Sequence, residues 1–273
     1  MDRTPQSDLV YDVGAHHGED SDFYLKAGYR VVAVEANPAL AAELRLRFAD
    51  AIAQGRYTLV ERAVGPREGT LTFYVNDLVS DWGTADPAWA ERNRRHGAPS
   101  RSLTVPCVPF AAILERHGCP HYLKVDVEGA DMLCIAALEQ TGARPALLSI
   151  ESSSASWTAL RAEFRALEAL GYTRFKVIDQ SRHTSGTYAA RDGSRFTHTF
   201  PEGASGPFGA DLPGSWLTAA QAIQRYRRIF VGYALIGSHP RLMRALARLP
   251  LVRRLLRYAT WYDTHALHEG AAG

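Results

Sequence analysis

The chain has 273 residues, of which 46% are hydrophobic and 22% charged, and its formal net charge is +2. This length and composition allow a sizeable core, either one large α/β domain or a domain with an extension. Its three cysteines show no metal-type spacing, and their odd number argues against a disulfide framework. With no room for a signal peptide before the first predicted strand and no apolar run of ~18 residues, we expect a soluble, cytoplasmic protein.

Predicted strands and helices alternate along the first part of the chain. Residues 8–13 predict a short buried strand, followed by a glycine-rich turn and a helix over about 19–27. A second strand covers 31–38, and Pro38 begins the next helix. Further strands are predicted at 57–64, 71–75, 102–108, 121–129, 146–152 and 172–179, and further helices at 110–118, 130–142 and 158–171.

Two stretches depart from this alternation. The turn GPREG between residues 64 and 71 predicts a hairpin in place of a simple crossover. Residues 76–100 are polar, aromatic and without clear periodicity, and we interpret them as a mobile flap. The remaining pattern predicts an α/β fold with a doubly wound, mostly parallel, Rossmann-like sheet over residues 1–180.

Residues 181–273 are expected to form an extension packed on the main domain, where it would shape the substrate site. After a Gly-, Ser- and Pro-rich part, 217–258 is predicted to be helical, with breaks at Pro240 and Pro250. From Leu212 to Tyr262 there are nine arginines and no Asp or Glu. The basic amphipathic segment 241–258 favours packing on the main domain, with peripheral contact to an anionic membrane as the alternative. Nucleic-acid binding is disfavoured because the rest of the chain is net acidic.

The first predicted turn reads YDVGAHHGED, with the spacing Asp12-x-Gly14-x-x-x-Gly18. Glycines here let the backbone approach a ligand at a helix N-terminus. The spacing differs from the three-glycine pattern of dinucleotide-binding proteins, and Ala15-His16-His17 fills the space that a pyrophosphate needs. The turn therefore predicts a ligand without a pyrophosphate.

Acidic residues end four of the predicted strands: Asp12, Glu35, Asp126 and Glu151. In a doubly wound sheet these ends border the ligand crevice. Glu35 lies 21 residues after Gly14, where an acid accepts both ribose hydroxyls in dinucleotide folds. Asp12 is placed to order an amino group, directly or through water. A ribose, a cationic centre and no phosphate together suggest S-adenosylmethionine.

Several motifs resemble the FkbM-type S-adenosylmethionine-dependent methyltransferases: DVGAHHG, VVAVEANP, ERAVG, LKVDVEGADMLCIAAL (123–138) and the Glu of LLSIE. The resemblance covers about residues 9–179, and WYDTHA (261–266) also looks like this family. It implies a class I methyltransferase fold and O-methylation of a hydroxyl on a sugar, polyketide or other secondary metabolite. The partner would be a small-molecule or glycan substrate, and neither its identity nor the oligomeric state is indicated.

The resemblance also implies site residues. Asp12, Gly14 and Gly18 match its first cofactor motif, Glu35 matches the ribose acid, and Ala63 of ERAVG joins the cofactor-binding residues. Asp126 falls where the family places an acid beside the reacting methyl group. The family commonly has Thr-Leu-Asp before the helix at 111–116, where this chain has Pro109-Phe110-Ala111.

Methyl transfer to an alcohol needs a group that takes the hydroxyl proton. Our candidates for catalysis are His17 and Asp126, and the other bases considered are His16, Glu128, His183 and His265. Asp126 and Glu151 together could supply half of an oxygen-ligand site for a divalent cation. Lys124 is expected to pair with an acid of the same edge. Glu128 and Asp131 are expected to cap the following helix.

Two alternatives to a methyltransferase remain open at this stage. One is a nicotinamide-dependent oxidoreductase on a related fold, which the missing third glycine disfavours. The other is a non-catalytic protein that keeps a cofactor pocket.

Overall fold

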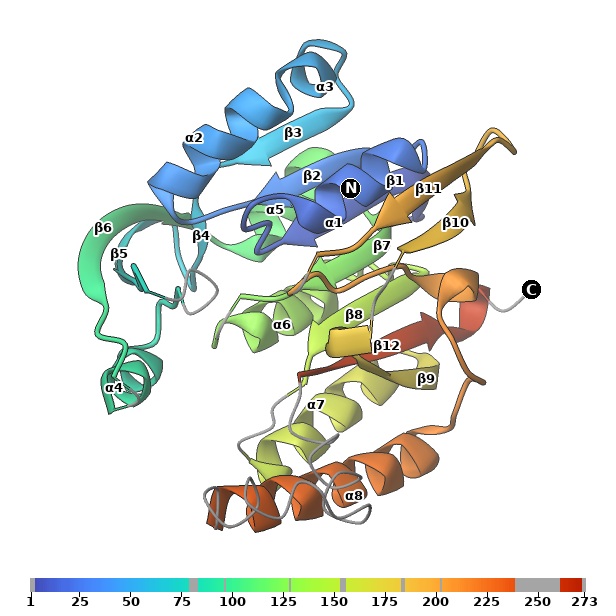
Figure 1. Cartoon of the computed structure of the whole chain (residues 1–273). Helices are drawn as coiled ribbons and strands as arrows, with labels where there is room; N and C mark the ends of the chain where they lie inside the picture. The colour runs from blue at the N-terminus through green and yellow to red at the C-terminus, as the bar shows by residue number, and fades with distance from the viewer. Residues whose placement is uncertain are drawn as a thin grey trace.

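The protein is built around a seven-stranded sheet, shown in a computed structural model (Figure 1). The model describes residues 3–78, 83–95, 97–127, 129–152, 156–182, 185–201, 203–238 and 261–271. The strand order is β3-β2-β1-β7-β8-β12-β9, in which β12 is antiparallel to both of its neighbours and the first five strands are parallel. These strands are β1 Gln6–Val13, β2 Arg30–Val34, β3 Tyr57–Val60, β7 Pro120–Val125, β8 Leu147–Glu151, β9 Tyr172–Asp179 and β12 Tyr262–His268.

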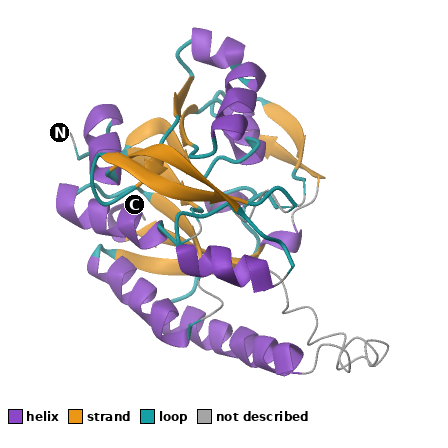
Figure 2. Cartoon of the chain, turned by 90° about the vertical axis from the view of Figure 1, so that its left-hand side faces the viewer, coloured by secondary structure: helices purple, strands orange, loops and turns teal. Residues whose placement is uncertain are grey.

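Helices cover both faces of the sheet, which confirms the doubly wound prediction (Figures 1 and 2). One face packs against helices α5, α6, α7 and α8, and the other against α1, α2 and α3. Their bounds are α1 Glu19–Lys26, α2 Pro38–Arg47, α3 Ala49–Ala53, α5 Phe110–His117, α6 Asp131–Thr141, α7 Trp157–Ala169 and α8 Ala219–Ser238.

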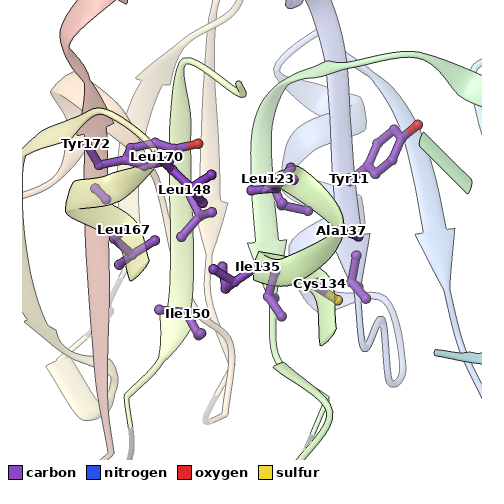
Figure 3. Close-up of a cluster of buried hydrophobic side chains, with 14 of the residues drawn as sticks. Tyr11, Leu123, Cys134, Ile135, Ala137, Leu148, Ile150, Leu167, Leu170 and Tyr172 are labelled. Carbon is purple, nitrogen blue, oxygen red and sulfur yellow. The ribbon is translucent and has the colours of Figure 1, made fainter. Parts of the chain in front are cut away.

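The core is densest beneath α6 and α7. Leu123, Leu148 and Ile150 project from the central strands onto Ile135 of α6 and Leu167 of α7 (Figure 3). All five side chains are buried. Parallel strands that are covered on both faces need continuous apolar sequences, and the sequences that predicted β7 and β8 have this property.

A second, three-stranded sheet with the order β4-β6-β5 lies beside the main one. It comprises β4 Ala63–Val64, β5 Gly69–Val75 and β6 Arg101–Val108. The single strand predicted at 57–64 is therefore wrong: the backbone bends after Val60, where Arg62 N–H donates to its carbonyl, and β4 leaves for the second sheet. The predicted hairpin at the GPREG turn is also wrong, because β5 pairs over seven residues with β6 and not with the strand before the turn.

The region 76–100, interpreted as a flap, contains helix α4, Pro87–Arg95. Thr84 pairs with Tyr74 of β5 through two backbone hydrogen bonds, which attaches the segment before α4 to the second sheet. The described residues of this region are thus more regular than their sequence indicates.

The extension after β9 contributes to both faces. The hairpin of β10 Ser185–Ala189 and β11 Arg195–Thr199 runs beside α1, whereas α8 lies against α7 and β9 (Figure 1). The helix predicted at 217–258 is confirmed over the residues of α8 as far as Ser238. Pro240, Pro250 and the basic segment 241–258 lie outside the described residues. No described helix is both long and apolar enough to cross a bilayer.

Candidate cofactor and acceptor site

A cavity of about 330 Å³ opens at the carboxyl edge of the parallel strands. Its volume falls within the ~300–1,000 Å³ typical of small-molecule sites. The cavity is lined by residues of both sheets, of the turns after β1, β2, β7 and β9, and of the loops around them. The lining residues are Gly14, Ala15, His16, Glu19, Asp20, Val34, Glu35, Ala36, Asn37, Leu40, Arg62, Ala63, Val64, Phe73, Gly83, Ala85, Lys124, Asp126, Val127, Ala130, Glu151, Gln180, Ser181, Gly203 and Trp261. Of the predicted site residues, Gly14, Glu35, Ala63, Asp126 and Glu151 meet here.

The turn after β1 needs a glycine at position 14 for a local reason. Gly14 has a φ of +85°, and a Cβ at this position would lie 1.8 Å from the backbone carbonyl oxygen of Asp126. The N–H groups of Gly14 and Ala15 both donate to the carbonyl of Val34. Gly14 therefore brings the ends of β1, β2 and β7 together at the cavity.

Gly18 has a different role from the one its spacing suggested. It has a φ of +80° and stands at the N-terminus of α1, and a Cβ there would overlap the side chains of Leu44 and Phe48. It does not line the cavity. This glycine lets α2 and the following turn pack closely on α1, and its predicted contact with the cofactor stays a prediction.

Glu35 presents its carboxylate to the cavity while the rest of the side chain is buried. Its Oε2 accepts from the His16 N–H at 2.9 Å, and its Oε1 accepts from the Asn37 N–H at 2.7 Å. Burial raises the pKa of Glu35, against the lowering effect of these two backbone donors. Because a carboxylate has about four acceptor positions, two remain for hydroxyl groups of a ligand.

A buried ion cluster forms part of the cavity wall, since Lys124, Asp20 and Asp126 line the cavity. Lys124 Nζ is 3.1 Å from Asp12 Oδ1, 3.2 Å from Asp20 Oδ2 and 3.9 Å from Asp126 Oδ2. Burial disfavours the ammonium, but the three carboxylates outweigh it and hold the pKa of Lys124 well above its ordinary value. The expected pairing of Lys124 with an edge acid is present, and its stable charge argues against a nucleophilic or basic role.

Asp12 is fully buried and does not line the cavity. Its carboxylate accepts from Ser21 Oγ at 2.6 Å and from Lys124. A contact between Asp12 and the cofactor's amino group would therefore have to pass through water, and this role of Asp12 stays a prediction. Asp20, which sequence reasoning missed, lines the cavity and also accepts from Lys124.

Asp126 follows β7 and is half-buried at the cavity wall. Its own N–H donates to the carbonyl of Val13 at 2.9 Å, which fixes the backbone that carries it. The loop that follows is held by Asp131, whose carboxylate accepts from the N–H groups of Val127 and Gly129. Burial is the main reason that the pKa of Asp131 rises to about 6. Asp131 stands in the first turn of α6, but its carboxylate holds the preceding loop and does not make the expected side-chain capping hydrogen bond to the helix. Glu128 lies outside the described residues.

The structure places His17, a candidate catalytic base, away from the cavity lining, and its catalytic role stays a prediction. Its ring lies outside the cavity, is 39% exposed, and has Nδ1 2.8 Å from Glu43 Oε2 of α2. His16 lines the cavity instead, with a φ of +50°. His265 is buried in β12 beside Tyr122 and does not reach the cavity, and His183 lies outside the described residues.

The divalent cation site predicted from Asp126 and Glu151 gains no third ligand. Both side chains line the cavity, but the described part of the chain contains no group of three His, Cys, Asp or Glu residues that could hold a metal ion. The cation stays a prediction, tested by activity after exhaustive chelation.

The acceptor side of the cavity contains residues that sequence reasoning missed. Gln180 and Ser181 follow β9, and Trp261, which is 54% exposed, precedes β12. We looked for acids at the ends of predicted strands; the same search extended to all polar residues would also have found Gln180 and Ser181. Trp261 carried no signal beyond its position beside the family-like WYDTHA motif.

The strand order, with an antiparallel β12 between β8 and β9, is that of the class I methyltransferase fold. A model of the FkbM methyltransferase domain matches residues 12–174. The chain belongs to the FkbM methyltransferase family, and it is a S-adenosylmethionine-dependent methyltransferase. This assignment removes the nicotinamide-dependent oxidoreductase and the non-catalytic alternative.

The chain also matches solved structures of low identity. Precorrin-6Y C5,15-methyltransferase from Geobacter metallireducens is 15% identical, with 72% of this chain and 78% of that chain covered and a TM-score of 0.38. A SAM-dependent methyltransferase from Geobacter sulfurreducens in complex with S-adenosyl-L-homocysteine is 12% identical, with 98% and 87% covered and a TM-score of 0.36. No curated protein matches the chain significantly.

The cavity fits this cofactor. Glu35 offers two acceptor positions for the ribose hydroxyls, and the apolar side chains of Leu40, Ala63 and Val64 beside it suit an adenine ring. The lining also contains Asp20, Asp126 and Glu151, whose negative charge suits a sulfonium. A pyrophosphate would meet these same carboxylates unfavourably.

Proposed function

We propose that this methyltransferase transfers the methyl group to a hydroxyl oxygen of a sugar, a polyketide or another secondary metabolite. The observation that carries this proposal is the position of Asp126 on the wall of the same cavity as Glu35, two strands along the sheet. With the adenosyl group on Glu35, the reacting centre falls toward β7, where the Asp126 carboxylate can meet an acceptor hydroxyl.

The chemistry that the residues must supply is limited. Bound S-adenosylmethionine supplies an electrophilic methyl group, whose bond to sulfur breaks as the bond to the acceptor oxygen forms. Asp126 accepts the hydroxyl proton as the oxygen attacks, and Lys124 holds its carboxylate from 3.9 Å away. The buried Lys124 keeps its own proton throughout because three carboxylates surround it.

A direct assay tests this proposal. The protein is incubated with S-adenosylmethionine and a panel of methyl glycosides, macrolide aglycones and simple alcohols, together with amine and thiol acceptors of similar size. We expect S-adenosylhomocysteine to form with an alcohol, and the product to carry its new methyl group on oxygen by mass spectrometry and NMR. A methyl group found on nitrogen, sulfur or carbon, or cofactor binding without turnover on every alcohol, would reject it.

A further inference from the structure

The turn after β9 lies at the opposite end of the cavity from the predicted ribose site. Glu35 follows β2, Asp126 follows β7, and Gln180 follows β9, with β1, β7, β8 and β12 between the first and last of these strands. All three side chains line one cavity. If the cofactor extends from Glu35 to Asp126, Gln180 lies beyond the reacting centre, on the side that the acceptor must occupy.

Gln180 is held in place by both its backbone and its side chain. Its N–H donates to the carbonyl of Trp261 at 3.1 Å, and its Nε2 donates to Asp263 Oδ1 at 2.6 Å. Asp263 is 2% exposed and lies in β12, where it is paired with Glu151 on one side and Ile178 on the other. Because Asp263 is fixed between two strands, it holds the side chain of Gln180 in one position.

This arrangement sets the orientation of the Gln180 amide. The NH₂ end of the amide faces Asp263, because Nε2 donates to its Oδ1, and an ionised carboxylate can only accept. The carbonyl oxygen Oε1 is then the acceptor that the side chain can offer to a ligand in the cavity. An oriented amide acceptor recognises a hydroxyl or amine donor, and it discriminates against a donor-free analogue.

We propose that Gln180 binds the acceptor substrate by accepting a hydrogen bond from one of its hydroxyls through Oε1, and that Asp263 is the positioning residue that orients the amide. The inference rests on the proposed function, because it assigns the hydroxyl-bearing substrate to this end of the cavity. Gln180 would contact a second hydroxyl, or the reacting one before transfer, while Asp126 takes the proton.

A structural experiment tests the contact without a known substrate. Crystals of the S-adenosylhomocysteine complex are soaked in glycerol, a small polyol probe. We expect a glycerol hydroxyl within hydrogen-bond distance of Gln180 Oε1, and its loss in Gln180→Ala with the cofactor unchanged. The assignment would be overturned if glycerol bound only elsewhere in the cavity, as an adventitious additive only, or if no glycerol bound in the cavity.

Kinetics test the two roles separately once an alcohol acceptor is in hand. We expect Gln180→Ala and Asp263→Ala to raise the acceptor KM by about 3- to 10-fold, the loss of one hydrogen bond, with the KM of S-adenosylmethionine unchanged. Asp263→Asn retains an acceptor oxygen and should restore the acceptor KM. Gln54→Ala, at an exposed glutamine after α3, is the matched control.

The outcomes distinguish this inference from the proposed function. An unchanged acceptor KM in Gln180→Ala, or a fall in kcat and Tm in Asp263→Ala that Asp263→Asn does not rescue, would overturn the inference while O-methylation stands. If no alcohol is methylated, the proposed function fails, and the glycerol soak still decides whether Gln180 binds hydroxyls.

Discussion

At the scale of single residues, Glu35 is the group on which cofactor affinity should depend most. Its carboxylate also joins the turns after β1 and β2 through the N–H groups of His16 and Asn37. We expect Glu35→Ala to weaken S-adenosylhomocysteine binding by about 1.5–3 kcal/mol, the cost of losing charge-assisted hydrogen bonds. Calorimetry measures this, with Glu43→Ala on the exposed face of α2 as the control. Equal affinity in the two variants would contradict the ribose assignment.

Asp126 gives a prediction on catalysis instead of binding. Replacement by Asn keeps the shape of the side chain but removes its ability to take a proton. We expect Asp126→Asn to lower kcat by about 10²–10⁴-fold while S-adenosylhomocysteine affinity changes little. Single-turnover assays with the best alcohol acceptor measure the rate. A variant that retains wild-type kcat would require another base, and His16 would be the first to test because it lines the same cavity.

Lys124 links the site to stability. Lys124→Met would leave Asp12 and Asp20 buried without their cation, at a cost of about 3–5 kcal/mol. Burial already raises the pKa of both aspartates, and removal of Lys124 raises them further. The folded variant would then bind more protons than the unfolded chain, so its stability falls as pH rises above the ordinary aspartate pKa.

The predicted loss of stability with rising pH can be measured. In urea unfolding, the stability difference between wild type and Lys124→Met should be larger at pH 8 than at pH 5. Lys26→Met, which removes an exposed ion pair with Asp22, should cost less than about 1 kcal/mol at both values. A loss of stability at Lys124 that does not change with pH would show that packing, not charge, dominates there.

The sequence located acids at the cavity edge because position along a strand is readable, but it could not give the direction of a side chain at the end of a strand. Acids at the ends of β2, β7 and β8 do line the cavity. Asp12, at the end of β1, does not line the cavity, because its carboxylate contacts Lys124 and Ser21 of α1. His17 does not line the cavity for a similar reason: one residue along a tight turn separates the cavity wall from the exposed surface.

At the scale of elements, the hairpin of β10 and β11 should stabilise α1 through aromatic packing. The Phe23 ring lies 4.9 to 5.6 Å, between centroids, from the rings of Tyr188, Phe196, His198 and Phe200. We expect Phe23→Ala to lower the free energy of unfolding by about 3–5 kcal/mol. Leu46→Ala, at a side chain that is 81% exposed, should change it by less than about 0.5 kcal/mol. Similar values for both variants would mean that the hairpin adds little stability.

Elements with a strong apolar pattern were predicted well, and those that depend on distant partners were not. The central strands and most helices follow from periodicity alone. β5 could not be paired correctly, because its partner β6 begins 26 residues after β5 ends. β12 was missed as a strand because it buries Asp263, Thr264 and His265, polar residues that only tertiary contacts can satisfy.

At the scale of the whole molecule, the extension and the main sheet share one structural unit. β12 lies between β8 and β9 and pairs with both, although it is separated from β9 by more than 80 residues of chain. Among the described strands, β9 joins the main sheet through β12. The same strand carries Asp263 and follows Trp261, so the last described segment completes both the sheet and the acceptor end of the cavity.

A truncation tests this dependence. A chain that ends at residue 180 keeps every parallel strand but leaves β8 and β9 without the strand that joins them, and it also loses α8 from the α7 face. We expect the truncated chain to lose its cooperative urea transition and to aggregate, since buried backbone groups and apolar side chains become exposed. Four glycines inserted between Asp192 and Gly193, in the exposed turn of the β10–β11 hairpin, should leave the transition nearly unchanged. If the truncated chain unfolded as cooperatively as the full one, residues 1–180 would be an independent domain, and the extension would serve the substrate site alone.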